Sequence, residues 1–182
     1  VVTGMGCVSA LGNTPEILWE NLLAGKSGVT TITHFDTSAY EVHFAAEVKE
    51  FDASPYFNDR DQKRYSRNIQ YAVSAASDAV KNSGLNVDSL DKSRAGVILA
   101  SGMGGMDVYY DTSATLSNKG PRRVSPFFIP MAITNMAAGE VSIRFGFMGP
   151  NFTTTSACAS SNHALIAAAD QIRLGRADVM LA

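Results

Sequence analysis

Residues 151–163 read NFTTTSACASSNH, and the change of pattern inside this stretch decides the fold. Its three consecutive threonines favour extended backbone, whereas the alanine-rich residues from Cys158 to Leu174 favour a helix that ends at Gly175. We therefore predict a strand over about 152–156, followed directly by a helix over about 158–174. Cys158 lies where the strand passes into the helix.

The rest of the chain alternates between the periods of strands and helices in the same way. Thr14 and Pro15 predict the start of a helix that runs to about Ala24, and the apolar run from Ala95 to Ser101 predicts a buried strand. We also predict helices over 59–83, 106–117 and 133–145, strands over 1–3 and 178–182, and irregular or short-stranded backbone over 28–55. This alternation indicates an α/β layered domain. We assign residues 1–182 to one domain that is incomplete at both ends, because both ends look like interrupted strands.

The composition excludes several classes of protein. The 182 residues are 46% hydrophobic and 18% charged, which is typical of a globular protein and excludes disorder. The net charge of −2 gives no overall positive field for nucleic acid, and no apolar run is long enough to enter a membrane, so we expect neither partner. Two cysteines are too few for a disulfide framework and suit a reducing compartment. We therefore predict a cytoplasmic protein, or one of the plastid stroma if the source is a plant.

Cys158 is the candidate for chemistry. The start of a helix presents unpaired N–H groups and a partial positive charge, and both stabilise a thiolate. The small side chains around Cys158 leave room for a substrate, so the junction is similar to a nucleophile elbow with sulfur in place of a serine oxygen. The alternative is a buried structural cysteine, which is the role that we expect for Cys7.

None of the three histidines is predicted to serve Cys158. His163 follows Cys158 by five residues, so on a helix the two side chains would point to different faces. His34 and His43 lie in the irregular region, and we expect all three histidines to be structural. No spacing typical of a metal site occurs, so we predict no metal.

Seven short motifs occur in the order and spacing of one enzyme family. They are VVTGMG at 1–6, Phe35-Asp36, GMGG at 102–105, SPFFIP at 125–130, TNM at 134–136, GPN at 149–151 and SACA at 156–159. On these motifs the chain resembles the N-terminal half of a β-ketoacyl-(acyl carrier protein) synthase of the elongating type. The resemblance implies a thiolase-like layered αβαβα fold, of which this chain forms the N-terminal half, and a homodimer. The chain departs from the pattern at Ser156, where threonine is usual, and at Tyr65-Ser66, where methionine and aspartate are common.

The resemblance also implies a reaction. Cys158 would take an acyl group from acyl carrier protein, and malonyl-carrier protein would lose carbon dioxide to give a carbanion that attacks the acyl thioester. This decarboxylative Claisen condensation extends the chain by two carbons in fatty acid biosynthesis, and the backbone N–H of Cys158 would stabilise the oxyanion. Two histidines and a lysine of the C-terminal half assist in such enzymes, and no residue here matches them, so we expect this chain alone to be inactive. No cofactor is expected, because phosphopantetheine arrives on the carrier protein.

Two further residues match positions around the acyl group. Met103 matches the position that lines the acyl pocket, where side-chain size limits the chain length. Phe128 matches a position at the dimer interface near the tip of that pocket. Ordinary core packing is the alternative for both side chains. The GMGG turn that contains Met103 lacks the residues and spacing of a phosphate loop, which excludes that function.

Four basic side chains share the spacing i, i+3, i+4, i+7 of one helix face. They are Arg60, Lys63, Arg64 and Arg67. Family members dock the acidic acyl carrier protein on residues that match Arg60, Lys63 and Arg64, with Arg122 and Arg123 as further matches that the other subunit could supply. Arg67 extends the set on spacing alone. The alternative is a solvated charged face that binds no partner.

Two rival functions stay open at this point. A polyketide-type ketosynthase, or a thiolase-fold enzyme that uses coenzyme A thioesters, would have the same fold and the same cysteine. A non-catalytic interaction protein would instead act through its dimer-forming helices, and its Cys158 would be inert.

Overall fold

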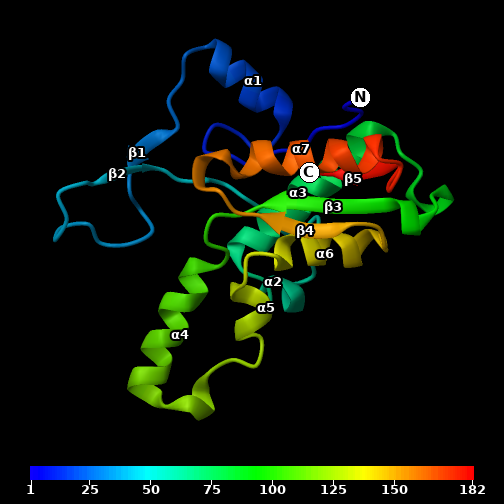
Figure 1. Ribbon diagram of the computed structural model, residues 1–182. Coiled ribbons are helices and arrows are strands. Elements are labelled where there is room, and N and C mark those ends of the chain that lie inside the picture. The colour runs from blue at the N-terminus through cyan, green and yellow to red at the C-terminus, as the bar shows by residue number, and fades with distance from the viewer.

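A computed structural model describes residues 1–182 and is built around a three-stranded parallel sheet (Figure 1). The strands are β3 (Ala95–Ala100), β4 (Asn151–Thr154) and β5 (Val179–Leu181), in the spatial order β4-β3-β5. They confirm the strands predicted over 95–101, 152–156 and 178–182. The register pairs Ala100 with Thr154, so β3 and β4 end side by side at the same edge of the sheet.

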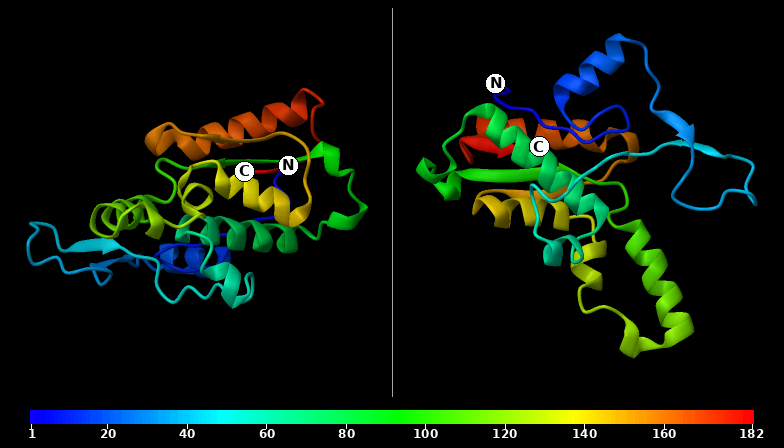
Figure 2. Two further views of the ribbon diagram at one scale, coloured as in Figure 1. Left: turned by 90° about the horizontal axis from the view of Figure 1, so that it is seen from below. Right: turned by 180° about the vertical axis from the view of Figure 1, so that it is seen from behind.

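Helices cover both faces of this sheet (Figure 2). α7 (Ser160–Arg173) packs on one face, and α6 (Met136–Phe145) packs on the other, with α3 (Arg67–Ser83) against α6. Val97 and Ile98 of β3 are both fully buried, because consecutive strand side chains point to opposite faces and both faces are covered. The chain therefore forms helix, sheet and helix layers, as predicted for an α/β domain.

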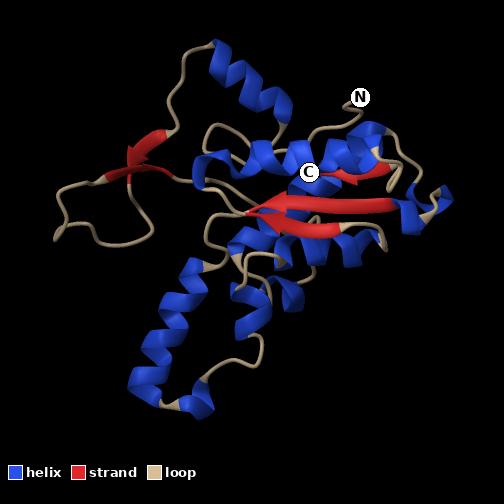
Figure 3. Cartoon of the chain, in the orientation of Figure 1, coloured by secondary structure: helices blue, strands red, loops and turns tan.

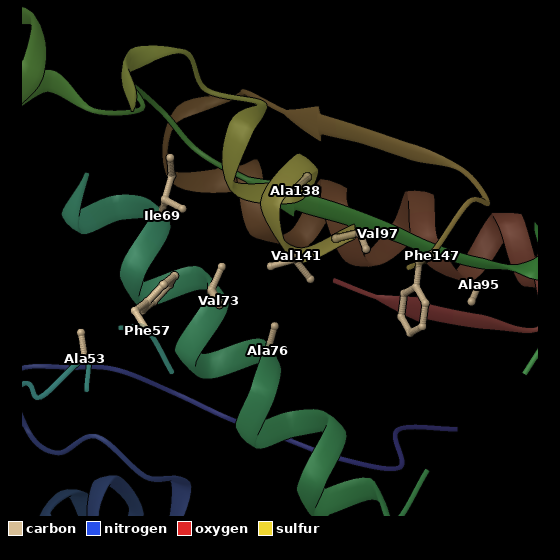
Figure 4. Packing of buried hydrophobic residues seen from close by; sticks show 10 residues of the cluster. All are labelled: Ala53, Phe57, Ile69, Val73, Ala76, Ala95, Val97, Ala138, Val141 and Phe147. Atoms are coloured by element: carbon tan, nitrogen blue, oxygen red, sulfur yellow. The ribbon is translucent and has the colours of Figure 1, made fainter. Parts of the chain in front are cut away.

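The main core lies between the sheet and the pair formed by α3 and α6 (Figure 4). Its members are Ala53, Phe57, Ile69, Val73, Ala76, Ala95, Val97, Ala138, Val141 and Phe147. A smaller cluster on the other face joins Ile98 to Ala164 and Ala168 of α7. Because its inward side chains are alanines, α7 lies close to the sheet, and its first turn follows directly from the end of β4.

Two arms project from this body (Figures 1 and 3). One arm contains α1 (Pro15–Leu23) and the antiparallel strands β1 (Val29–Thr31) and β2 (Phe44–Ala46). The other contains α4 (Met106–Lys119), the 3-10 turn η3 (Pro121–Arg123) and α5 (Phe128–Ala132). The remaining elements are short: α2 (Asp59–Gln62), η1 (Val87–Ser89), η2 (Lys92–Arg94) and η4 (Ala157–Ala159). None of the helices has the length and apolar character that crossing a membrane requires.

Several predicted helices are confirmed with small shifts of their ends. Thr14 caps α1 by accepting a hydrogen bond from the N–H of Ile17, and Pro15 is the first helical residue. α4 extends to Lys119. α6 begins at Met136 instead of residue 133, because Ile133 has extended backbone that ends the preceding helix α5.

The predicted continuous helix over 59–83 is wrong. α2 ends at Gln62 with Lys63 as its C-cap, and Ser66 has extended backbone, with φ −62° and ψ 158°, before α3 begins. The side-chain amide of Gln70 stabilises this break by donating hydrogen bonds to the carbonyl oxygens of Gln62 and Tyr65, each 2.9 Å long. The four basic side chains from Arg60 to Arg67, which were expected on one face of one helix, are therefore divided between two segments.

The predicted strand over 1–3 is also wrong, since these residues join no sheet. The chain instead runs against α3, where Gly4 and Gly6 meet the carbonyl oxygens of Ala79 and Ala75 so closely that a Cβ atom would overlap them. This close backbone contact directs the segment along the helix.

An ion pair joins the start of β3 to the start of β5. Arg94 donates to both carboxylate oxygens of Asp178, at 2.5 and 2.6 Å, and this hydrogen bonding lowers the pKa of Asp178. Because the folded pKa is lowered, the stabilisation is present above the unfolded value of about 3.9 and is lost as the pH falls through the folded value.

The pair predicts a pH-dependent effect of Asp178→Asn. Both side chains are well exposed, so the substitution should lower the melting temperature of the intact protein by only a few degrees at pH 7. At an acidic pH low enough to protonate the carboxyl in both states, we expect the two proteins to melt together. Calorimetry at the two pH values measures this, and an equal loss at both would contradict the assigned role of the ion pair.

Candidate active site

Cys158 lies in η4, the 3-10 turn that links β4 to α7, and its side chain is exposed. The helix predicted over 158–174 is accordingly observed from Ser160 to Arg173. Ala157 has φ +50°, in the left-handed region that residues with a Cβ atom rarely adopt. A strained residue directly before an exposed cysteine is the geometry of a nucleophile elbow. The exposure of Cys158 does not fit the alternative of a buried structural cysteine.

Ser160 closes the elbow with two hydrogen bonds. Its side chain is buried, and its Oγ accepts from the N–H of Ser156 at 2.8 Å and donates to the carbonyl oxygen of Ala157 at 2.7 Å. Thr154 at the end of β4 donates its Oγ1 proton to the carbonyl oxygen of Ser160 at 2.8 Å. The first turn of α7 is thus bonded to the two residues before Cys158 and to the strand that precedes them.

The turn after β3 lies beside this elbow. Thr155 Oγ1 donates to the carbonyl oxygen of Ser101 at 2.8 Å, and the N–H of Gly104 donates to Ser101 Oγ at 2.9 Å. Gly104 has φ +67°, and a Cβ atom there would overlap the carbonyl oxygen of Ala132. The tight turn predicted over 102–105 is therefore present at the same sheet edge as Cys158.

Met103 lies in this turn, and Phe128 lies in the arm that follows it, at the start of α5. Met103 is 59% exposed, so ordinary core packing does not explain it. Phe128 is half-buried, and its ring meets the ring of Tyr109 edge-on, with 5.4 Å between centroids. Phe128 therefore fixes α5 against α4, and Met103 lies on the turn that leads into α4.

The histidines contact polar groups other than Cys158. His163 Nδ1 is 2.6 Å from Ser156 Oγ, His43 Nδ1 is 3.1 Å from a threonine hydroxyl, and His34 Nε2 is 3.8 Å from a carboxylate oxygen of Glu47. Among residues 1–182, no three His, Cys, Asp or Glu side chains are arranged to hold a metal ion. The contact of His163 with the elbow was not predicted from the sequence.

A sequence signal for this contact was available. Ser156, Ser160 and His163 are spaced by four and three residues, which is the spacing of one helix face. The helix was expected to begin at residue 158, so Ser156 was not placed on the same face as Ser160 and His163.

Cys7 differs from Cys158 in its surroundings. Its side chain is half-buried, and burial raises the pKa of its thiol, with further contributions from the negative charges of Glu16 and Asp78. A thiol of raised pKa is a poor nucleophile, in agreement with the structural role expected for Cys7.

The structure separates the basic residues into three places. Arg60 and Lys63 are exposed on and after α2, whereas Arg64 lies 5.0 Å from the centre of the Phe127 ring and 3.9 Å from Asp61. Arg67 is exposed and lines a polar cavity that Glu47 also lines, and its membership of the basic set stays a prediction. Arg122 and Arg123 are exposed in η3, at the far end of α4 and away from α2 (Figure 1).

A family model described as the N-terminal domain of β-ketoacyl synthase matches residues 1–182. The chain belongs to the β-ketoacyl synthase family. It is 44% identical over all 182 residues to 3-oxoacyl-[acyl-carrier-protein] synthase 2 of Vibrio cholerae, and 42% identical over 181 residues to the synthase of the same name from Staphylococcus aureus. These matches confirm the family resemblance. The chain spans 44% and 45% of the length of these two relatives.

Solved structures confirm the ketosynthase fold. The ishigamide ketosynthase/chain length factor superposes with a TM-score of 0.88 at 27% identity, covering 97% of this chain and 44% of that one. A β-ketoacyl synthase from Burkholderia phymatum gives 0.83 at 26% identity over 97% of this chain and 44% of that one. The ketosynthase of a type II polyketide complex with its acyl carrier protein gives 0.82 at 23% identity, covering 99% and 48%. The thiolase-like architecture expected from the motifs is therefore confirmed.

Proposed function

We propose that Cys158 carries an acyl group as a thioester, and that the protein containing this chain condenses it with malonyl-acyl carrier protein in fatty acid biosynthesis. The observation that carries the proposal is the exposed thiol of Cys158 on a strained turn at the carboxyl end of β4. The names of the Vibrio cholerae and Staphylococcus aureus relatives support the reaction class and the carrier protein.

The reaction has two steps. The Cys158 thiolate first attacks the carbonyl carbon of an acyl thioester on the carrier protein, and the sulfur of the carrier's phosphopantetheine leaves as a thiolate. Malonyl-carrier protein then loses carbon dioxide, its carbanion attacks the acyl carbonyl, and the Cys158 thiolate leaves, which yields a 3-oxoacyl thioester two carbons longer. Both steps form a tetrahedral oxyanion, and we assign the backbone N–H of Cys158 as one donor to it. The groups that assist decarboxylation match no residue in 1–182.

Sequence identity favours this function over its rivals. Identity to the fatty acid type of synthase is 42–44%, whereas identity to the superposed ketosynthases is 23–27%. The polyketide-type and coenzyme A-dependent alternatives are therefore not favoured. An inert interaction protein would have no need of a strained, exposed cysteine turn.

A condensation assay on the intact protein tests the proposal. The protein is given acyl-carrier protein and malonyl-carrier protein, and mass spectrometry measures the 3-oxoacyl-carrier protein formed while released carbon dioxide is counted. We expect one product per carbon dioxide. Turnover with coenzyme A thioesters alone, or no turnover with either donor, would contradict the proposal.

We propose that carrier protein docks on Arg60, Lys63 and Arg64, near the junction of α2 and α3, with Arg122 and Arg123 as a second basic group. Charge reversal by Lys63→Glu together with Arg64→Glu should raise the KM for carrier protein about tenfold, with kcat little changed, because opposite charges steer association. The increase should be larger at low salt. Lys81→Glu, which reverses one charge at the end of α3 instead of two, is the control and should leave KM unaltered. Equal effects of both variants would contradict the docking assignment.

We also propose that the arm formed by α4 and α5 belongs to a homodimer interface. Large apolar side chains are exposed on it, namely Met106, Tyr109, Tyr110, Leu116 and Ile129. A patch of this kind usually marks an interaction surface. Tyr110→Glu should shift the intact protein toward the monomer in analytical ultracentrifugation by at least about tenfold in dissociation constant. An unchanged association constant would contradict the proposed interface.

A further inference from the structure

We propose that Ser160 and His163 are positioning residues that hold the Cys158 turn in the geometry required for acyl transfer. The inference rests on the function proposed above and assigns roles to two residues of α7 that do not touch the reacting atoms.

The backbone directly before Cys158 is strained. Ala157 has φ +50°, a conformation that costs free energy for any residue with a Cβ atom. It persists only if neighbouring groups stabilise it more than they would stabilise the relaxed turn. Cys158 follows immediately, so a relaxation of Ala157 would move both the Sγ atom and the backbone N–H of Cys158.

Ser160 supplies the central restraint. Its Oγ is bonded to the N–H of Ser156 on one side of Ala157 and to the carbonyl oxygen of Ala157 on the other, at 2.8 and 2.7 Å. Ser160 is 95% buried, so water does not compete readily for these bonds. One hydroxyl therefore bridges the peptide group before Ser156 and the peptide group that links Ala157 to Cys158, and it fixes both relative to α7.

His163 supplies a second restraint one turn further along α7. Its Nδ1 lies 2.6 Å from Ser156 Oγ, so the Ser156 residue is held by Ser160 through its backbone and by His163 through its side chain. His163 thus acts on Cys158 through Ser156. This role also gives a reason for a hydroxyl at position 156, where threonine is usual in the family and would keep the same bond.

The chemistry distinguishes positioning from simple thiol reactivity. Acyl transfer needs the sulfur and an oxyanion donor in one fixed relation, and small displacements of either reduce the rate steeply. Alkylation by iodoacetamide needs an accessible thiolate but no oxyanion donor. A loosened elbow should therefore slow acylation much more than alkylation.

The experiment measures both rates for Cys158 in the intact protein. Acylation by acyl-carrier protein and alkylation by iodoacetamide are followed by mass spectrometry of the peptide that contains Cys158. The variants that remove a restraint are Ser160→Ala, His163→Leu and Ser156→Val. The matched variants that keep a hydrogen-bonding group are Ser156→Thr, which has the shape of valine, and His163→Asn, whose amide can occupy the place of Nδ1. Circular dichroism checks that each variant is folded.

We expect the three restraint-removing variants to acylate at least about tenfold more slowly, with alkylation changed by less than about twofold. Ser156→Thr and His163→Asn should stay within about threefold of the wild type in both rates. A parallel fall of acylation and alkylation, no fall in acylation, or no rescue by the matched variants would overturn the positioning roles. If the wild type itself is not acylated, the proposed function fails; if it is acylated and the variants match it, only the positioning roles fail.

Discussion

Cys158→Ala should reduce kcat for condensation in the intact protein by at least about 10⁴-fold, because loss of a covalent nucleophile leaves only binding and oxyanion stabilisation. The side chain is exposed and alanine is smaller than cysteine, so the fold should survive. Steady-state formation of 3-oxoacyl-carrier protein measures the effect, and a matched melting temperature confirms that the variant is folded.

Cys7→Ala is the matched control for this result. It makes the same substitution at a half-buried thiol whose pKa is raised by burial. We expect kcat within about twofold of the wild type, since Cys7 lies outside the elbow. If Cys7→Ala abolished condensation and Cys158→Ala did not, the nucleophile would be misassigned.

Met103→Phe should change which acyl chains are accepted. Met103 is exposed on the turn beside the elbow, so a larger side chain there can shorten an acyl pocket without disrupting a core. We expect kcat/KM for the longest acyl chains to fall about 100-fold, because their last few methylene groups no longer fit in the pocket. For short acyl chains, kcat/KM should change by less than about threefold. Competition between acyl-carrier proteins of different length measures the profile.

Met148→Phe is the control for pocket shape. Met148 is also exposed, but its N–H is bonded to the carbonyl oxygen of Lys92, just before β3, at the opposite edge of the sheet. Its substitution should leave the chain-length profile unaltered. An unchanged profile for Met103→Phe, or the same shift for both variants, would remove Met103 from the acyl pocket.

Local sequence patterns predicted the parts of the fold that depend on local forces. The capped start of α1 at Thr14 follows from side-chain chemistry that acts within one turn, and β3 follows from an apolar run that both faces of the sheet bury. The break between α2 and α3 was not predictable in this way. Charged residues of good helix propensity occupy it, and the Gln70 amide that stabilises it comes from the next turn of the chain.

In the candidate site, too, some features follow from the local sequence and others depend on the folded structure. Cys158 could be found because two patterns meet at it, and the structure places it on an exposed turn. The contribution of Ser160 and His163 depends on the left-handed backbone of Ala157, which no residue preference at an alanine predicts. The basic residues had the spacing of one face, but the interrupted helix separates Arg64 and Arg67.

The most direct test is the mass of the intact protein after incubation with acyl-carrier protein in the absence of malonyl-carrier protein. We predict a single added acyl group, located on the peptide that contains Cys158 and removed by hydroxylamine as a thioester is. An acyl group found on another residue, or a mass that does not change, would contradict the claim that Cys158 is the acyl acceptor.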